Sequence, residues 1–155
     1  MRTHNFIGVG FLIVLLTGAQ AQQEQRFVLL PPSQANSLAE KYERKGPDRI
    51  DGTWQPTTSQ IQALEANLSR ISDLRSYDAP NGEQIEYPDR YFRQYVAVIR
   101  AGERLIYINA LCDVRNIPQW RNQLVSVYDG GNCFWQAWYD PATGSFSELA
   151  VNGRA

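Results

Sequence analysis

The sequence predicts an α+β fold in which one long amphipathic helix packs on an antiparallel sheet of four to five strands. Two patterns carry this prediction. Apolar residues recur at helical intervals of three and four between Ile61 and Leu74. From Tyr91 onward the period changes to two, and aromatic and β-branched residues dominate the segments that follow. A helical stripe followed by alternating segments is typical of a helix that lies across one face of a sheet.

The first 21 residues have the organisation of a cleavable signal peptide. A basic residue precedes an apolar run over 6–16, and Ala19 and Ala21 supply the small side chains that signal peptidase requires. The run is shorter than the about 20 residues that cross a hydrocarbon core, so a membrane anchor is the less favoured alternative. We therefore expect a mature protein that begins at Gln22, has no membrane span and is periplasmic or secreted.

Residues 22–51 are expected to form a poorly structured lead to the folded domain. Pro31 and Pro32 interrupt any helix there, and charged residues are dense after residue 40. One short helix is compatible with residues 33–44. The α+β domain is predicted over residues 52–155, and the sequence leaves open whether the lead packs on it.

The long helix is the clearest element of the prediction. Thr57 is followed three residues later by Gln60, which is the spacing of a capping box at a helix start. Polar residues occupy the face opposite the apolar stripe, so one side of a helix of about 17 residues is expected to be buried. The stripe comprises Ile61, Leu64, Leu68, Ile71 and Leu74. Residues 76–88, which include Asn81-Gly82 and two prolines, then form a linker.

Five segments with the composition of β-strands follow this linker. Glycine-containing loops over 101–103 and 129–132 each separate two of the segments, and each predicts a hairpin. The last segment follows a turn over 141–144. The predicted strands are Tyr91–Arg100, Arg104–Cys112, Gln123–Tyr128, Cys133–Asp140 and Ser145–Val151.

Cys112 and Cys133 are the two cysteines of the chain, and in an oxidising compartment they are expected to form a disulfide. Two separate buried thiols are the alternative. In a plain meander, the segment 123–128 would hold the two cysteines roughly 20 Å apart, whereas a bridge needs Cα atoms within about 7 Å. Either the bridge is absent, or the strands that carry the cysteines pair directly while residues 113–121 cross back. We favour the second arrangement.

The closing segment Phe134–Gly144, a strand followed by an Asp-Pro-Ala-Thr-Gly turn, resembles the ending of PepSY repeats. A helix followed by a curled antiparallel sheet likewise resembles the cystatin and PepSY type of α+β domain. Other stretches are similar to small exported bacterial proteins, namely 91–95, 106–109, 129–134 and 151–155. The resemblance covers residues 52–155 and implies a fold and a compartment but no activity. The cystatin inhibitor motif, a Gln-x-Val-x-Gly loop, is absent.

The register of the first hairpin determines which residues share a face. With a three-residue loop, Arg100 opposes Arg104, and the apolar side chains of both strands lie toward the helix with Gln94 as the one polar exception. A two-residue loop would shift the register by one residue and mix the faces, so we favour the three-residue loop.

The opposite face of this hairpin is the candidate binding surface. Tyrosine combines an apolar ring with a hydroxyl group, and arginine offers a planar fork of donors for carboxylate or phosphate. Such a mixture suits a ligand or a protein partner. A solvated face, or one covered by residues 22–56, is the alternative. The candidate residues are Arg93, Tyr95, Tyr107 and Asn109.

The composition excludes several kinds of site. The one histidine, His4, lies inside the expected signal peptide, so the mature chain cannot form a Ser-His-Asp, Cys-His or histidine-ligated zinc site. The 15 basic and 16 acidic residues give a net charge of −1 without a basic stripe, which argues against a nucleic-acid partner. We therefore expect no catalytic residues, no cofactor and no bound metal.

These patterns favour an exported, non-enzymatic binding or interaction module. Its partner would be an envelope or extracellular protein, or a small ligand. One alternative is a histidine-free hydrolase that acts on envelope glycan or peptide through carboxylates such as Asp129, Asp140 and Glu148. Aspartates in turns more commonly accept hydrogen bonds from nearby main-chain amides, however. A structural component of the envelope is a further alternative.

Overall fold

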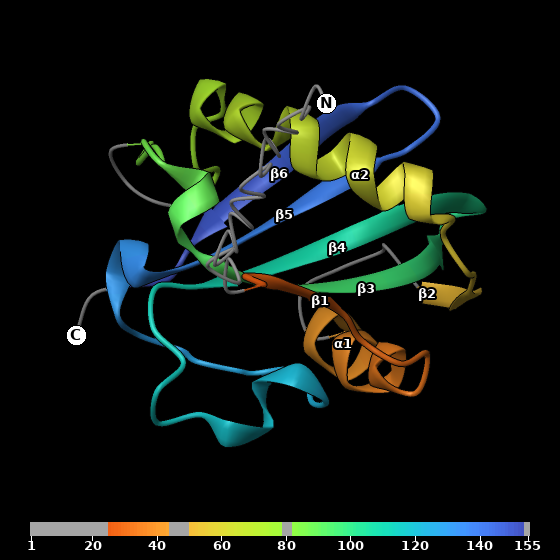
Figure 1. The fold of residues 1–155 in the computed structure, drawn as a ribbon, viewed down its shortest axis with the longest axis horizontal. Helices are drawn as coiled ribbons and strands as arrows, with labels where there is room; N and C mark the ends of the chain where they lie inside the picture. Colours follow the sequence, from red (N-terminus) through yellow and green to blue (C-terminus); the bar gives the residue numbers. More distant parts are fainter. Residues whose placement is uncertain (1–24, 44–49, 79–81, 154–155) are drawn as a thin grey trace, which may run out of the picture.

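The computed structural model describes residues 25–43, 50–78 and 82–153, and a six-stranded mixed sheet forms the centre of this part of the chain (Figure 1). The strand order is β1-β3-β4-β5-β6, and β2 also pairs with β3. The pair β1 and β3 is parallel, and the other pairs are antiparallel. The strands are β1 (Phe27–Leu29), β2 (Ile50–Thr53), β3 (Phe92–Arg100), β4 (Glu103–Leu111), β5 (Phe134–Asp140) and β6 (Ser145–Val151).

The α+β class is confirmed, but one long helix on an antiparallel sheet of four to five strands is wrong. The strand β1 and the first half of β2 belong to the segment that we expected to be a poorly structured lead, and the two strands pair with opposite ends of β3. Main-chain hydrogen bonds from Arg93 N to Arg26 O (2.7 Å) and from Leu30 N to Tyr95 O (2.8 Å) extend the β1 pairing. A strand of three residues is too short to show a period of two, and the sequence pattern therefore missed it.

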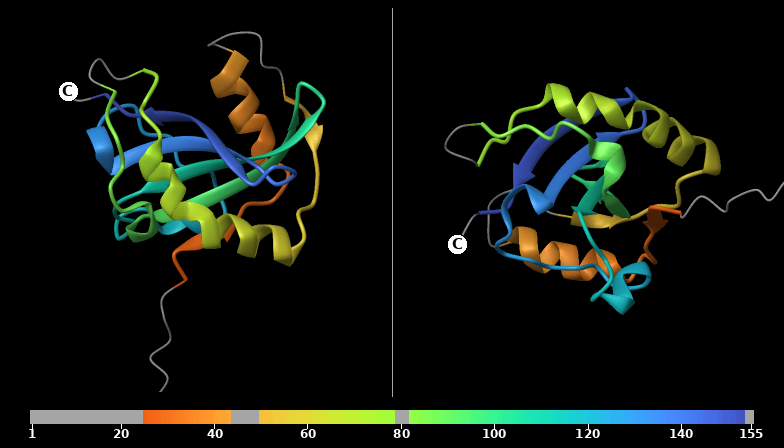
Figure 2. Two further views of the ribbon diagram at one scale, coloured as in Figure 1. Left: turned by 90° about the horizontal axis from the view of Figure 1, so that it is seen from above. Right: turned by 60° about the vertical axis from the view of Figure 1, so that its left-hand side comes forward.

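Two helices lie on opposite faces of the sheet (Figure 2). The helix α1 (Gln34–Glu43) lies within residues 33–44, where the sequence allows one short helix. On the other face, α2 (Thr58–Asn67) begins with the predicted capping box. Gln60 N donates to Thr57 Oγ1 (3.3 Å), and Thr57 N donates to Gln60 Oε1 (2.9 Å).

The α-helical part of this second helix is shorter than predicted. It has ten residues and continues as a 3₁₀ helix of six residues, η1 (Leu68–Asp73). At the change, the Asn67 side chain donates to the carbonyl of Ala63 (2.8 Å) and Asn67 itself leaves the helical conformation. Residues three apart lie on one side of a 3₁₀ helix, so Leu68 and Ile71 both stay buried against the sheet.

The sheet is covered on both faces, and each face has its own hydrophobic core. The larger core lies under α2 and includes Tyr95, Ile108 and Trp135. The smaller core lies under α1 and includes Tyr107 and Trp138. Most side chains of β3 and β4 are consequently buried whichever face they point to.

The turn between β3 and β4 corrects the predicted register. It has two residues, and Arg100 opposes Glu103 where we expected a three-residue loop with Arg100 opposite Arg104. Both turn residues have positive φ, 51° at Ala101 and 82° at Gly102, as in the type I′ turn whose twist fits a hairpin. In β4, Ile106 and Ile108 face α2 as predicted, whereas the β3 residues Val96 and Val98, which were predicted on the same face, point toward α1.

The disulfide and the direct pairing of β4 with β5 are confirmed. Cys112 and Cys133 are bonded with their Cα atoms 4.9 Å apart, and Leu111 lies opposite Phe134 in the adjoining ladder. The predicted strand and hairpin over 123–128 are wrong, because this stretch forms no strand and belongs to the connection that crosses back under the sheet. That connection contains only short 3₁₀ turns, η3 (Pro118–Arg121) and η4 (Gly131–Cys133).

The expected signal peptide, residues 1–21, lies outside the described residues. Among the residues that are described, no helix combines the length and the apolar character needed to cross a membrane.

Candidate functional site

The four residues of the predicted binding surface do not share a face. The ladder pairs Gln94 with Asn109 and Tyr95 with Ile108, so Arg93 and Tyr95 point toward α2, whereas Tyr107 and Asn109 point toward α1. Each of the four is at most 3% exposed. The contiguous surface is therefore wrong because of the register shift, and a binding role for any one of these residues stays a prediction.

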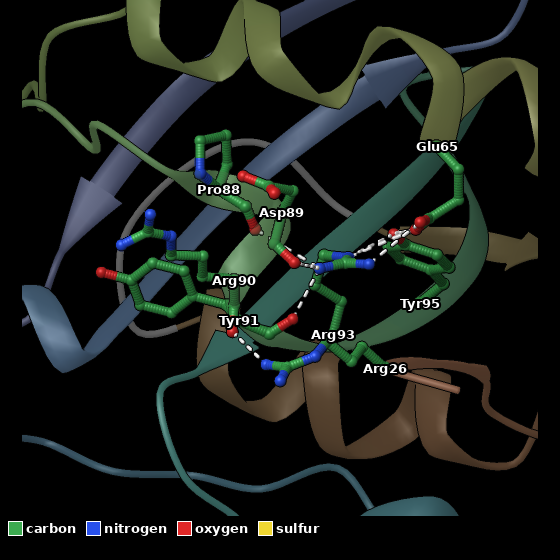
Figure 3. A network of polar contacts seen from close by, with 8 residues as sticks. All are labelled: Arg26, Glu65, Pro88, Asp89, Arg90, Tyr91, Arg93 and Tyr95. Carbon is green, nitrogen blue, oxygen red and sulfur yellow. Dashed lines mark hydrogen bonds and ion pairs between the residues drawn. The ribbon is translucent and has the colours of Figure 1, made fainter. Parts of the chain in front are cut away.

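Arg93 is the centre of a polar network under α2 (Figure 3). Its Nε and Nη2 atoms donate to the two carboxylate oxygens of Glu65, at 3.2 and 2.9 Å. The Tyr95 hydroxyl donates to the same carboxylate and accepts from Arg93 Nε (3.1 Å). Arg93 Nη1 donates to the carbonyls of Asp89 (3.0 Å) and Tyr91 (2.5 Å). The arginine thus joins β3 to α2 and to the turn η2 (Pro88–Arg90).

The protonation states of this network are fixed by its burial and its partners. Burial lowers the pKa of Arg93 because it disfavours the charged guanidinium. The interactions with Tyr95 and Glu65 outweigh this effect of burial, and the pKa of Arg93 is raised. Burial, together with the neighbouring Glu65 carboxylate, raises the pKa of Tyr95 well above its ordinary value. Arg93 is therefore charged and Tyr95 neutral at physiological pH. The donors of Arg93 are engaged within the fold, and the network therefore holds β3, α2 and η2 together.

A second polar cluster lies on the α1 face, where Gln94 and Asn109 are buried side by side. Asn109 Nδ2 donates to Gln94 Oε1 (2.9 Å) and to the carbonyl of Val125 (2.9 Å). Val125 N donates to Gln94 Oε1 (2.9 Å), and Gln94 Nε2 donates to the carbonyl of Gln123 (2.6 Å) and to that of Trp120. The two side-chain amides therefore supply the hydrogen bonds that a neighbouring strand would have given to the connection after Cys112.

Three further amide side chains extend this anchoring. Gln34 Oε1 of α1 accepts from Leu124 N (2.8 Å). Asn152 Nδ2 donates to the carbonyl of Val127 (2.6 Å), and Gln136 Nε2 donates to Asn152 Oδ1 (3.1 Å). The stretch that we predicted as a strand is thus held by side chains, which a pattern of apolar residues does not reveal.

A cavity of about 370 Å³ lies at the end of the sheet where the disulfide closes. Residues 84–87, with Arg90 and Tyr91, form one wall, and Cys112 and Asn132 form the other. The Tyr91 hydroxyl donates to the carbonyl of Asn132 (2.8 Å) and joins the walls, while burial raises the pKa of Tyr91. Arg90 and Tyr91 point to the same side, away from the Arg93 and Glu65 side chains (Figure 3).

The arginine of this cavity is available to a ligand. The Arg90 guanidinium stacks over the ring of Tyr87, with its central carbon 4.1 Å from the ring centroid. Within the described part of the chain, the guanidinium forms no hydrogen bond and no ion pair. The Tyr87 residue is 52% exposed. A stacked guanidinium keeps its planar donors in a fixed orientation, which suits a carboxylate or a phosphate.

One residue of the same wall, Ile85, has main-chain groups without a partner among the described residues. Ser72 and Ser76 hold the segment from one side, through the carbonyls of Glu86 (3.1 Å) and Glu83 (2.8 Å). Ile85, which is only 1% exposed, bonds through neither its N–H nor its carbonyl to any described residue. Buried main-chain groups are nearly always bonded to protein, ligand or water, so these two groups mark a place for a polar ligand or ordered water.

Two of the three carboxylates considered for a hydrolase, those of Asp140 and Glu148, bond within the fold. Asp140 accepts from Ala142 N (2.8 Å) and Thr143 Oγ1 (2.7 Å) in its own turn. Glu148 pairs with Arg100 at 3.0 Å. Asp129 lies in the connection, where its carbonyl accepts from Asn152. No group of three or more potential metal ligands occurs among the described residues.

The cavity was missed because we interpreted residues 76–88 only as a linker. The signal that could have revealed it is the spacing of Tyr87 and Arg90 around Pro88, two large side chains of binding-site type in a polar linker. Comparison with protein-family models, with curated proteins and with solved structures gives no match.

Proposed function

We propose that the protein is an exported, non-enzymatic binding module whose ligand occupies the cavity between residues 84–91 and the Cys112–Cys133 disulfide. The observation that carries the proposal is the Arg90 guanidinium, which lines the cavity, stacks on Tyr87 and bonds to no described residue. A volume of about 370 Å³ is within the usual range of sites for small ligands.

The absence of catalysis is proposed from the lining of the cavity. Glu86 is the one carboxylate among the described residues that line it, whereas hydrolysis by carboxylates alone requires two acidic groups with different roles. The mature chain supplies no histidine to replace the second group. No observation favours the hydrolase alternative over binding.

Export is proposed from the signal-peptide pattern and is supported by the disulfide, because disulfides persist in oxidising compartments. The intact mass of the protein recovered outside the cytoplasm tests it. A chain that begins at Gln22 supports export, and a recovered chain that retains residues 1–21 contradicts it.

Binding is tested by nuclear magnetic resonance on the ¹⁵N-labelled mature protein. Three probes represent three ligand classes: N-acetylglucosamine for saccharides, acetyl-Ala-Ala-Ala free acid for peptides and inorganic phosphate for anions. We expect at least one probe, at up to about 10 mM, to shift the amide signals of residues 84–91 and Asn132 saturably. The Arg90→Ala variant should weaken that binding.

The matched control is Arg104→Ala. Arg104 is also exposed and lies over an aromatic ring, with its central carbon 5.8 Å from the centroid of Trp54, but it does not line the cavity. Its substitution should leave the shifts unchanged. If none of the three probes shifts the cavity signals of the folded protein, the proposal of a binding module fails and the structural alternative is favoured.

A further inference from the structure

The cavity combines two features that a single class of ligand would satisfy. One is the Ile85 main chain, whose N–H and carbonyl both make no hydrogen bond to any described residue. The other is the Arg90 guanidinium, fixed on the Tyr87 ring. Both residues line the same cavity.

The Ile85 groups match the main chain of another peptide. In a hydrogen-bonded pair of an antiparallel sheet, the N–H of one residue donates to the carbonyl of the opposite residue, and its carbonyl accepts from the N–H of that same residue. The neighbouring carbonyl of Glu86 is already bonded to Ser72, and that of Tyr87 is bonded to Arg90 N at 3.1 Å. Ile85 therefore offers a pairing site about one residue long, which binds the end of an extended chain better than its middle.

The charges of the cavity indicate which end of the chain enters. The guanidinium of Arg90 has a fork of donors that fits the two oxygens of a carboxylate. The cavity also contains Glu86, which repels a second negative charge. A ligand with a single carboxylate beside a peptide bond would pair with Arg90 and would bring no second negative charge close to Glu86.

We propose that the ligand is the carboxyl-terminal end of an extended peptide chain. Its terminal carboxylate binds Arg90, and the adjoining peptide group pairs with Ile85. This inference rests on the proposed function, because it assigns a ligand class to the same cavity. The volume of about 370 Å³ suits a few terminal residues of such a chain.

The experiment compares acetyl-Ala-Ala-Ala as free acid with the same peptide as carboxyl-terminal amide, by titration of the ¹⁵N-labelled mature protein. The acid should shift the Ile85 and Tyr87 amide signals and bind about tenfold more tightly than the amide, because the charge-assisted pair with Arg90 is lost in the amide. In Arg90→Ala, acid and amide should bind equally weakly. Arg104→Ala should preserve the difference.

A third peptide tests the main-chain pairing. Methylation of the terminal peptide nitrogen removes its donor, and binding should weaken although the carboxylate is unchanged. Peptides lengthened at the amino-terminal end distinguish two sources of the carboxyl terminus. Unchanged affinity assigns the site to the tails of longer chains, whereas reduced affinity assigns it to short free peptides. Both results support a carboxyl-terminal ligand.

The inference is overturned if the acid and the amide bind the unsubstituted protein equally, or if the peptide shifts signals outside the cavity. A third outcome is that N-acetylglucosamine or phosphate shifts the amide signals of the cavity while the peptide acid does not. That outcome would overturn this inference and leave the proposed binding function intact. The absence of shifts with every probe would overturn both. The ¹⁵N spectra of the two variants show directly that each is folded.

Discussion

Gln94 and Asn109 lie opposite each other on β3 and β4, and a hydrogen bond of 2.9 Å joins Asn109 Nδ2 to Gln94 Oε1 on the face that α1 covers. Both residues are at most 3% exposed. Their remaining amide groups bind the main chain of Trp120, Gln123 and Val125. The pair therefore fixes the connection after Cys112 to the sheet and closes this face of the core.

Replacement of Asn109 by alanine should destabilise the protein by about 2–3 kcal/mol. The substitution leaves the partly buried Val125 carbonyl without its donor and removes one partner of the buried Gln94 side chain, and an unsatisfied buried group costs roughly 1–3 kcal/mol. Unfolding in urea measures the change. Asn116→Ala is the control, because Asn116 is exposed in the same connection. Equal stability of the two variants would contradict the anchoring role.

The Tyr95 hydroxyl should make the protein less stable at alkaline pH. Burial raises the pKa of Tyr95 in the folded state above that of the unfolded chain. The stabilisation is therefore fully present below about pH 10 and is lost as the pH rises through the folded-state value. Other tyrosines with raised pKa values, Tyr77, Tyr91 and Tyr139, act in the same direction.

The measurement is the free energy of unfolding between neutral and alkaline pH, for the unsubstituted protein and for Tyr95→Phe. The free energy of unfolding of the variant should fall less steeply at alkaline pH, because the variant lacks the hydroxyl group whose ionisation is most strongly disfavoured in the folded state. Tyr128→Phe is the control, since Tyr128 is 78% exposed. A decline in Tyr95→Phe as steep as in the unsubstituted protein would show that Tyr95 does not contribute.

The disulfide should stabilise the protein by about 3 kcal/mol, because it closes a loop with a sequence separation of 21 residues. Reduction should raise the intact mass by about 2 Da, through the addition of two hydrogen atoms. It should lower the unfolding free energy without releasing the connection, which the amides of Gln94 and Asn109 also hold. Two free thiols in the oxidised, folded protein would contradict the bridge.

Local signals in the sequence predicted several elements correctly. The capping box of Thr57 and Gln60 fixed the start of α2, and the apolar stripe identified the buried residues Leu64, Leu68 and Ile71. The reach of a disulfide predicted that the strand before Cys112 and the strand after Cys133 are neighbours. Each of these features depends on residues that are close together or covalently joined.

The binding surface was mispredicted because of a single position in a turn. The dipeptide Ala101-Gly102 forms a two-residue turn although Ala is not a residue favoured at positive φ, so no strong turn signal is present at this position. The alternation of β3 and β4 could not reveal the error, because both faces of these strands are buried and each accepts apolar residues. The polar residues Arg93 and Asn109 are buried with partners that lie far away in the sequence.

The central claim is that the cavity beside the disulfide binds the ligand, and the most direct test is the dissociation constant of the tightest-binding probe for two tyrosine variants. Tyr87 lines the cavity under Arg90, whereas Tyr128 is exposed outside it. We expect Tyr87→Ala to weaken binding about tenfold, since it removes both an aromatic contact and the support of Arg90, and Tyr128→Ala to leave the dissociation constant unchanged. Equal dissociation constants for the two folded variants would contradict it.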